Sequence, residues 1–364
     1  MNKMKKKIKL FDPTIDSREE NALKKTLYSN FWASGSGNGQ VLNFENKFKK
    51  YLNSNSCIAV NNGTSALHLA LSLTNLKNKE VIIPSLSFVS TANAVIYNGG
   101  KPVFVDVDPV TLCIDADQIQ NKISQKTAVI LPVHFGGMPA NLTKLQQLSK
   151  NNDCLLIEDA AHAAGSSYNN NKIGSHGTAV CFSFHPVKNL AMPTGGLISL
   201  NNLKSKIFEK ELHAKRWCGI TNRVGATYDV KDLGWNMYMN EFSAAIGIVQ
   251  LSKLDKSNQK RKKIAQKYND QISIEHKMPF NKECAYHLYW VRVKNRKFFM
   301  KQLLDSGIET GIHYKPIHKM TFYKNKTKLP ITEKVGNEIV SIPIHPNLND
   351  DDVDYIIKKI NNFL

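Results

Sequence analysis

The sequence predicts an α/β protein in which a mostly parallel sheet lies between two layers of helices, followed by a smaller C-terminal α/β unit. Over the first 250 residues, short runs rich in Val, Ile and Leu alternate with helical stretches. Strands that are apolar throughout are typical of sheets covered on both faces. Because 364 residues exceed what one small core serves, we expect two domains, residues 1–250 and 251–364.

The apolar periodicity defines the expected elements in order. It predicts helices over 16–28 and 41–51, and a glycine-rich loop over 31–39. Strands are expected over 57–60, 80–84, 101–105, 128–133, 154–158, 179–184 and 196–200, the earlier ones separated by helices over 64–73, 88–97 and 139–150. The last three strands have less helix between them, which favours a mixed sheet.

The smaller unit begins after a change of pattern near residue 250. A basic helix over 251–268 is followed by a strand over 288–293, a helix over 296–306, a strand-like return over 308–314 and a closing helix over 352–363. No internal repeat or low-complexity linker appears in the sequence.

Composition excludes several classes of protein. Hydrophobic residues make up 42% and charged residues 22%, as in ordinary globular proteins, and no apolar run reaches the roughly 18 residues of a membrane span. The five lysines of residues 1–10 are followed by Asp12 and Pro13 rather than by a secretory apolar region. Six cysteines stand singly among mostly apolar neighbours, so we expect reduced thiols, no metal site and a cytoplasmic location.

The formal net charge of +19 is concentrated in one part of the chain. Residues 251–301 hold fourteen Lys and Arg against four Asp and Glu. A solvated, lysine-rich face is the favoured interpretation, and attraction of an anionic small substrate is the alternative. Aromatic residues are not interleaved with the basic ones as a base-stacking surface requires, so no nucleic-acid partner is expected.

The first motif that indicates chemistry follows the strand at 57–60. Asn62 and Gly63 allow a tight turn, and Thr64 and Ser65 open an apolar helix. The N-terminus of a helix presents unpaired N–H groups to which a phosphate binds, with the two hydroxyl groups as further donors. The alternative is that Thr64 only caps its helix. The Gly-Lys-Ser/Thr ending of a P-loop is absent.

The second and third motifs are polar residues at the ends of apolar strands. Asp159 ends one strand, where a dehydrated carboxylate needs a cationic partner such as a protonated ring nitrogen, and His162 follows three residues later. A capping Asp, a core His or a metal pair are the alternatives. Lys188 lies in a Pro-containing loop after another strand, where a desolvated amine can form a Schiff base; a solvated surface lysine is the alternative. Together the three motifs match the needs of pyridoxal phosphate.

The order and spacing of many short motifs resemble one family. They include Glu-Asp-Ala-Ala-His at 158–162 and Ser-Phe-His-Pro-Val-Lys at 183–188, with further matches at 63–67, 84–93, 102–106, 133–136, 239–247, 313–318 and 342–345. The sequence is similar over nearly its whole length to the DegT/DnrJ/EryC1/StrS sugar aminotransferases. These enzymes depend on pyridoxal phosphate and have the type I, aspartate-aminotransferase fold.

The resemblance implies a role for each matching residue. Lys188 would bind the cofactor covalently and then move protons, and Asp159 would pair with its ring nitrogen. His162 would lie near the phenolic oxygen and Phe88 would stack on the ring. The phosphate group would be held by Gly63, Thr64, Ser65 and Ser183. A homodimer with a shared active site is expected, with Asn236 reaching the phosphate of the neighbouring subunit; Tyr238 stands where Arg is common in the family.

The resemblance also implies the reaction. Glutamate would donate the amino group, and a nucleotide-linked 4-keto-6-deoxy sugar would accept it, with C4 favoured over C3 by the Asn-Asn-Gly-Thr-Ser-Ala-Leu form at 61–67. Formation of a UDP- or dTDP-4-amino-4,6-dideoxyglucose fits this expectation. The candidate substrate contacts are Trp32, His313, Tyr314 and His318.

Other functions remain open at this point. A C3 aminotransferase, a GDP-perosamine-type synthase, a sugar dehydratase and a non-catalytic protein built on this fold are the alternatives. Dehydratases of the family replace the cofactor-binding lysine with His, so Lys188 favours transamination. The chain departs from the family before Gly195, where 191–194 read Ala-Met-Pro-Thr instead of ending in the common Thr-Gly-Glu.

Overall fold

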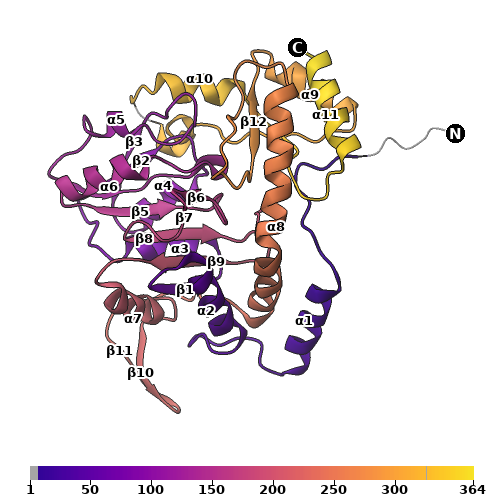
Figure 1. Ribbon diagram of the computed structural model, residues 1–364. Helices are drawn as coiled ribbons and strands as arrows, with labels where there is room; N and C mark the ends of the chain where they lie inside the picture. The colour runs from indigo at the N-terminus through magenta and orange to yellow at the C-terminus, as the bar shows by residue number, and fades with distance from the viewer. Residues whose placement is uncertain (1–6, 325) are drawn as a thin grey trace.

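A seven-stranded mixed sheet forms the centre of the protein in the computed structural model, which describes residues 7–324 and 326–364 (Figure 1). The strand order is β1-β9-β8-β5-β4-β2-β3. β9 runs antiparallel to both its neighbours, and the remaining pairs are parallel. The expected mixed sheet is therefore confirmed. Its strands are β1 (Ser56–Val60), β2 (Glu80–Pro84), β3 (Lys101–Val105), β4 (Thr127–Ile130), β5 (Leu155–Asp159), β8 (Ala179–Ser183) and β9 (Gly196–Leu200).

The sheet separates two apolar cores, as the alternation of β1 shows. Cys57 and Ala59 belong to one core, while Ile58 and Val60 belong to the other. Residues of α3 (Gly63–Leu71), α4 (Ser90–Tyr97) and α7 (Ser205–Lys215) fill the core that contains Ile58. Residues of α2 (Gln40–Leu52), α6 (Leu142–Asn151) and α8 (Glu241–Gln271) fill the opposite core. Burial on both faces explains why the strand sequences are apolar throughout.

The C-terminal part forms a smaller unit around the antiparallel pair β12 (Tyr289–Arg292) and β13 (Ile339–Ile342). Its helices are α9 (Arg296–Asp305), α10 (Pro330–Glu338) and α11 (Asp350–Asn362), with short 3₁₀ turns at Ile317–Lys319 and Thr321–Tyr323. Residue 250 lies inside α8, which joins this unit to the sheet (Figure 1), so the division at 250/251 stays a prediction. Ile8 forms a bridge with Ile308, which ties the N-terminal segment to the smaller unit.

Two expectations differ from the structure. The return at 308–314 forms no strand but two isolated bridges, one from Ile308 to Ile8 on one side and one from Gly311 to Ser341 on the other. A hairpin, β10 (Ile220–Val224) and β11 (Thr227–Val230), was not expected; it projects beyond α7 and β11 is exposed throughout (Figure 1). The remaining elements are α1 (Ser17–Tyr28), α5 (Ala116–Ile119), a 3₁₀ turn at Phe135–Gly137, β6 (Ser167–Tyr168) and β7 (Asn171–Lys172).

The basic start of the chain falls partly on residues 1–6, which lie outside the described residues. Within the described ranges, no helix combines the length and the apolar character that crossing a lipid bilayer requires.

A buried ion pair fixes α2 against β1 and the end of α7. Arg216 is fully buried, and its Nη1 donates to Glu45 Oε1 at 2.6 Å and to the carbonyl of Ala59 at 2.9 Å. The same carboxylate oxygen accepts the Ala59 N–H at 2.8 Å. Burial raises the pKa of Glu45, and the guanidinium opposes that rise. Each charge is tolerated in the interior only because the other is present.

We expect Arg216→Met to lower the free energy of unfolding by about 3–5 kcal/mol, because it leaves the Glu45 carboxylate buried without its counter-charge. Chemical denaturation measures the loss, and the double variant Glu45→Leu/Arg216→Met should recover much of it. Lys24→Met, which breaks the exposed pair with Glu20, is the matched control and should cost about 0.5 kcal/mol or less. Equal effects of the two single variants would contradict the prediction.

Candidate active site

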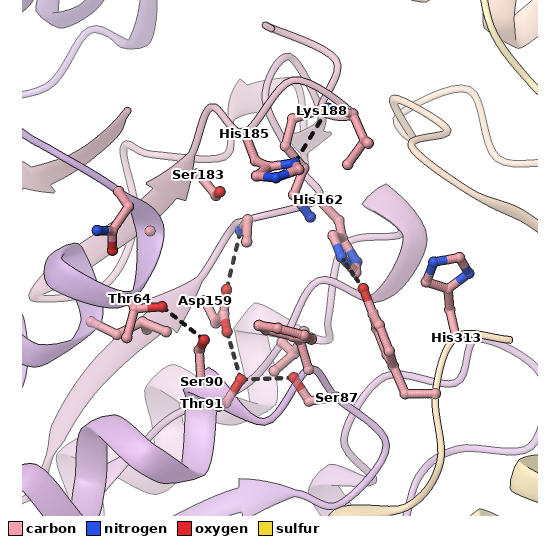
Figure 2. Close-up of a pocket in the computed structure, with 18 of the residues that line it drawn as sticks. Thr64, Ser87, Ser90, Thr91, Asp159, His162, Ser183, His185, Lys188 and His313 are labelled. Atoms are coloured by element: carbon pink, nitrogen blue, oxygen red, sulfur yellow. Dashed lines mark hydrogen bonds between the residues drawn. The ribbon is translucent and has the colours of Figure 1, made fainter. Parts of the chain in front are cut away.

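A cavity of about 330 Å³ opens at the carboxyl-terminal edge of the sheet, where the smaller unit meets it. Loops after β1, β2, β5 and β8 contribute to it, with Thr64, Ser87, Asp159 and Lys188 as examples (Figure 2). The segment just before β9 also contributes. Parallel strands present their carboxyl ends to one edge, which is where ligands bind in open α/β sheets. The residues that line it are Asn62, Gly63, Thr64, Leu67, Ser87, Phe88, Ser90, Thr91, Val133, Asp159, Ala161, His162, Ser183, His185, Val187, Lys188, Thr194, Gly195, His313 and Tyr314.

The N-terminus of α3 forms one wall of the cavity. Asn62 is the N-cap, and its side chain accepts the N–H of Ser65 at 2.8 Å. Gly63 packs so closely on Ser183 that a Cβ at this position would lie 2.6 Å from the Ser183 Cβ. Thr64 Oγ1 lies 2.7 Å from Ser90 Oγ at the start of α4 (Figure 2). Backbone N–H groups and hydroxyls thus converge into a cradle suited to a phosphate.

Ser65 turns away from this cradle. Its hydroxyl donates to Asn61 Oδ1 at 2.6 Å, and its side chain is buried. It lines a neighbouring hollow on the far side of the helix terminus, together with His68 and Trp235. In the single chain it therefore supports the loop before α3 and does not line the cavity.

Asp159 ends β5 and is 4% exposed. Its Oδ2 accepts from Thr91 Oγ1 at 2.8 Å, and its Oδ1 accepts from the Ala161 N–H at 3.1 Å. Thr91 in turn lies 2.7 Å from Ser87 Oγ, so a short chain of hydroxyls orients the carboxylate (Figure 2). Desolvation raises the pKa of Asp159, while these hydrogen bonds and the charge of Lys188 lower it. A positively charged group of a ligand next to Asp159 would form an ion pair with this buried carboxylate.

Lys188 reaches the cavity from the loop after β8, where its N–H donates to the carbonyl of His185 at 2.8 Å. Desolvation lowers the pKa of Lys188 to about 8, and Asp159 opposes that effect. Roughly a tenth of this amine is therefore uncharged and nucleophilic at pH 7, far more than for an unperturbed lysine. Its Nζ lies 3.4 Å from His287 Nε2.

The hydrogen bonds of His162 define its protonation. Nδ1 accepts the N–H of Gly136 at 3.2 Å, and Nε2 lies 3.1 Å from the hydroxyl of Tyr314 (Figure 2). Burial, followed by the charge of Lys188, holds the pKa of His162 well below its usual range. The neutral ring therefore carries its hydrogen on Nε2, which makes this atom a donor toward Tyr314 and the cavity.

Three residues at the opening of the cavity come from two different units. Phe88 is 56% exposed and lies 5.9 Å, ring to ring, from Tyr314. His313 Nδ1 is 2.9 Å from Ser341 Oγ, and burial lowers the pKa of His313 to about 4. The predicted residues Phe88, His313 and Tyr314 therefore meet at one mouth of the cavity.

Besides Ser65, three predicted residues do not line the cavity. His318 is fully buried, 2.6 Å from Ser85 Oγ, and its other nitrogen lies 3.3 Å from Glu333, so both nitrogens have partners. Trp32 is half exposed and donates to the carbonyl of Leu27 at 3.1 Å. Asn236 is exposed and forms an isolated bridge with Trp217.

Several site residues were not predicted. Ser87, Ser90 and Thr91 follow β2 at the same edge as Asp159, so a hydroxyl-rich strand end was the available signal. Thr194 precedes β9 and donates to the carbonyl of Asn61. His287 lies 99 residues after Lys188, and no local pattern marks it. Over the described ranges, no group of three or more His, Cys, Asp or Glu is arranged to hold a metal ion.

Curated relatives match nearly the full length of the chain. GDP-perosamine synthase of Escherichia coli O157:H7 is 32% identical, with 98% of this chain and 99% of the relative covered. The spore coat polysaccharide biosynthesis protein SpsC of Bacillus subtilis is 31% identical, with 97% and 96% covered.

Solved structures of aminotransferases also match nearly the full length of the chain. PseC of Helicobacter pylori, an aminotransferase of pseudoaminic acid biosynthesis, superposes with a TM-score of 0.92 at 26% identity, covering 98% of this chain and 99% of PseC. The PMP form of Spr1654 of Streptococcus pneumoniae, assigned as a sugar aminotransferase, gives 0.93 at 26% identity, with 98% of each chain covered. The same protein was solved with PLP.

These likenesses, and the match of the DegT/DnrJ/EryC1/StrS aminotransferase family to residues 13–361, agree with the site. The phosphate cradle at α3, the buried carboxylate of Asp159 and the amine of Lys188 are the groups that pyridoxal phosphate requires. The chain belongs to the DegT/DnrJ/EryC1/StrS aminotransferase family and is a sugar aminotransferase that depends on pyridoxal phosphate.

Proposed function

We propose that the enzyme transfers the amino group of L-glutamate to C4 of a nucleotide-linked 4-keto-6-deoxy sugar. The observation that carries the proposal is that Lys188, Asp159 and the N-terminus of α3 line a single cavity. The similarity to a GDP-perosamine synthase supports a nucleotide sugar as acceptor and makes a GDP sugar a specific alternative to UDP and dTDP sugars. Lys188, rather than His, supports transamination over dehydration.

The residues of the cavity would have separate roles in binding the cofactor and in moving protons. Bound pyridoxal phosphate supplies an electron sink and carries the amino group between the two substrates. Gly63, Thr64 and Ser183 would hold its phosphate, and Asp159 would keep its ring nitrogen protonated. Lys188 would bind it covalently and then accept and return a proton at Nζ, which its pKa of about 8 permits.

The remaining residues would position the cofactor and the sugar. His162 would donate from Nε2 to the phenolic oxygen of the cofactor, since its other nitrogen already accepts the N–H of Gly136. Phe88 would cover one face of the ring. We place the sugar between His313 and Tyr314 at the mouth of the cavity, where both side chains are partly exposed.

We further propose a homodimer whose partners share each active site. Support comes from the exposed Asn236, from the projecting hairpin β10–β11 and from exposed aromatic side chains outside the cavity, namely Tyr28, Phe31, Trp32 and Tyr97. In such a dimer Asn236 would enter the partner's phosphate cradle, and Trp32 would lie near the partner's sugar. Large apolar side chains left exposed on a chain are typical of interfaces.

We place the enzyme in the cytoplasm. All six cysteines, which lie within the described residues, are free thiols, and Cys218 is exposed. Free exposed thiols persist in reducing compartments, where glutathione and thioredoxin keep them reduced.

With glutamate and a panel of UDP-, dTDP- and GDP-4-keto-6-deoxyhexoses, we expect one acceptor to gain an amino group at C4, detected by mass spectrometry and NMR of the product. Lys188→Ala should retain its fold, lose the near-visible absorbance of the lysine-bound cofactor and lose at least about 10³-fold in rate, because the nucleophile and proton carrier are absent. Lys24→Ala, at an exposed site, is the control. Amination of no member of the panel would overturn the proposed substrate class.

The rate at which the cofactor-free protein captures pyridoxal phosphate should rise with pH and level off above about 8. Only the neutral amine attacks the cofactor's aldehyde, and desolvation lowers the pKa of Lys188 from 10.5 to about 8, so the neutral fraction grows as the pH rises through that value. Stopped-flow absorbance measures the rate. A midpoint near 10.5 would show an unperturbed, solvated amine.

Mixing Lys188→Ala and Asn236→Ala protomers tests whether the site is shared. If Asn236 enters the partner's site, each hybrid dimer regains one complete site, and random exchange restores about a quarter of the wild-type sites. If Asn236 acts within its own chain, no hybrid site is complete and no activity returns. Light scattering before and after mixing verifies the assembly.

A further inference from the structure

The free amine of Lys188 has a hydrogen-bond partner in the smaller unit. Nζ lies 3.4 Å from Nε2 of His287, which is 2% exposed and lies between α8 and β12. His287 is not among the residues that line the cavity, so it faces the lysine from behind the cavity wall. The contact joins the loop after β8 to a segment 99 residues further along the chain.

The imidazole of His287 is held firmly in place. Phe11 stacks on it with ring centroids 5.5 Å apart and planes 16° from parallel, and the ring of His162 lies 4.6 Å away. The N–H of His287 donates to the carbonyl of Gly136 at 2.9 Å. Because the N–H of Gly136 donates to His162 Nδ1, Gly136 contacts both the backbone of His287 and the ring of His162.

The groups around His287 keep it neutral. Lys188 faces it from the loop after β8, His162 from the loop after β5, His313 from the smaller unit and Arg261 from α8. Burial is the largest effect, and each of these groups further disfavours a charged ring, so the pKa of His287 lies well below its usual range. A neutral imidazole has one accepting nitrogen, and an ammonium group can only donate.

We propose that His287 is a positioning residue whose Nε2 accepts a hydrogen bond from the free Lys188 amine and holds that amine beside the cofactor cavity. The proposal rests on the assignment of Lys188 as the cofactor-binding amine. In this arrangement the hydrogen of His287 is on Nδ1, which has no partner among the described side chains and backbone groups. The lysine side chain has four rotatable carbons, and this hydrogen bond restricts the positions that its terminal amine can take.

The contact also affects the charge of Lys188. Burial lowers the pKa of Lys188, and Asp159 raises it. An acceptor that hydrogen-bonds the ammonium form favours that form, so His287 acts in the same direction as Asp159. His162, His185 and His313 also surround the amine, and burial lowers the pKa of each, so none contributes a full positive charge near pH 8. Loss of the His287 acceptor therefore moves the Lys188 pKa downward.

The test compares three substitutions in the cofactor-free full-length protein, with pyridoxal phosphate as the probe and its rate of capture followed against pH. His287→Leu removes the acceptor, and we expect the midpoint to fall by about one pH unit. His287→Gln carries an amide oxygen near the place of Nε2 and should stay within about 0.3 units of the wild type. His287→Asn is too short to reach Nζ and should follow His287→Leu, which covers the case in which Leu prevents folding.

The outcomes distinguish the role of His287 from the assignment of Lys188 as the cofactor-binding residue. Thermal melting identifies general destabilisation, which changes the amount of active protein without moving a pH midpoint. An unchanged or higher midpoint in His287→Leu and His287→Asn, or a glutamine variant that behaves like them, would overturn the role of His287. If Lys188→Ala captures the cofactor as the wild type does, the assignment of Lys188 itself fails.

Discussion

The direction of the strands is the constraint on which the site depends. β1, β2, β5 and β8 all end at the same edge, and β9, which runs the opposite way, begins there. The segments at this edge, together with Val133 after β4 and with His313 and Tyr314 of the smaller unit, line one cavity. Asp159 and Lys188 meet because β5 and β8 are paired, with Asp159 opposite Cys181, and the lysine follows β8 after one short turn.

Electrostatics then determines what the cavity can bind. Desolvation raises the pKa of Asp159 and lowers that of Lys188, so the site disfavours both charges when nothing is bound. The N-terminus of α3 adds unpaired N–H groups that favour an anion. The N-terminus of α3 would hold the phosphate of pyridoxal phosphate, Asp159 would pair with its protonated ring nitrogen, and Lys188 would supply the amine that binds it. The fit to this cofactor thus follows from the arrangement of the α3 N-terminus, Asp159 and Lys188 around one cavity.

Sequence reasoning located the large sheet well because its strands are short apolar runs with polar ends. The strands at 80–84, 101–105 and 196–200 have the predicted bounds, and Asp159 and Lys188 were found as polar residues at strand ends. The sequence did not reveal which of the two neighbouring hydroxyls at the start of α3 faces the cavity. Successive residues of a helix point in different directions, and Ser65, one residue after Thr64, donates to Asn61 instead of lining the cavity. His318 was predicted near the substrate, but pairing with Ser85 and Glu333 fixes it in the interior, and no local pattern encodes such a partner.

The segment before β9, which the resemblance predicts to differ from the common family pattern, contacts the loop that leads into α3. Thr194 stands in the segment that differs, and its hydroxyl donates to the carbonyl of Asn61, which lies just before the N-cap of α3. Gly196 packs on the carbonyl of Asn62, where a Cβ would lie 2.3 Å from that oxygen. The start of β9 therefore supports the phosphate cradle from behind. Thr194 therefore both lines the cavity and contacts the loop that leads into α3.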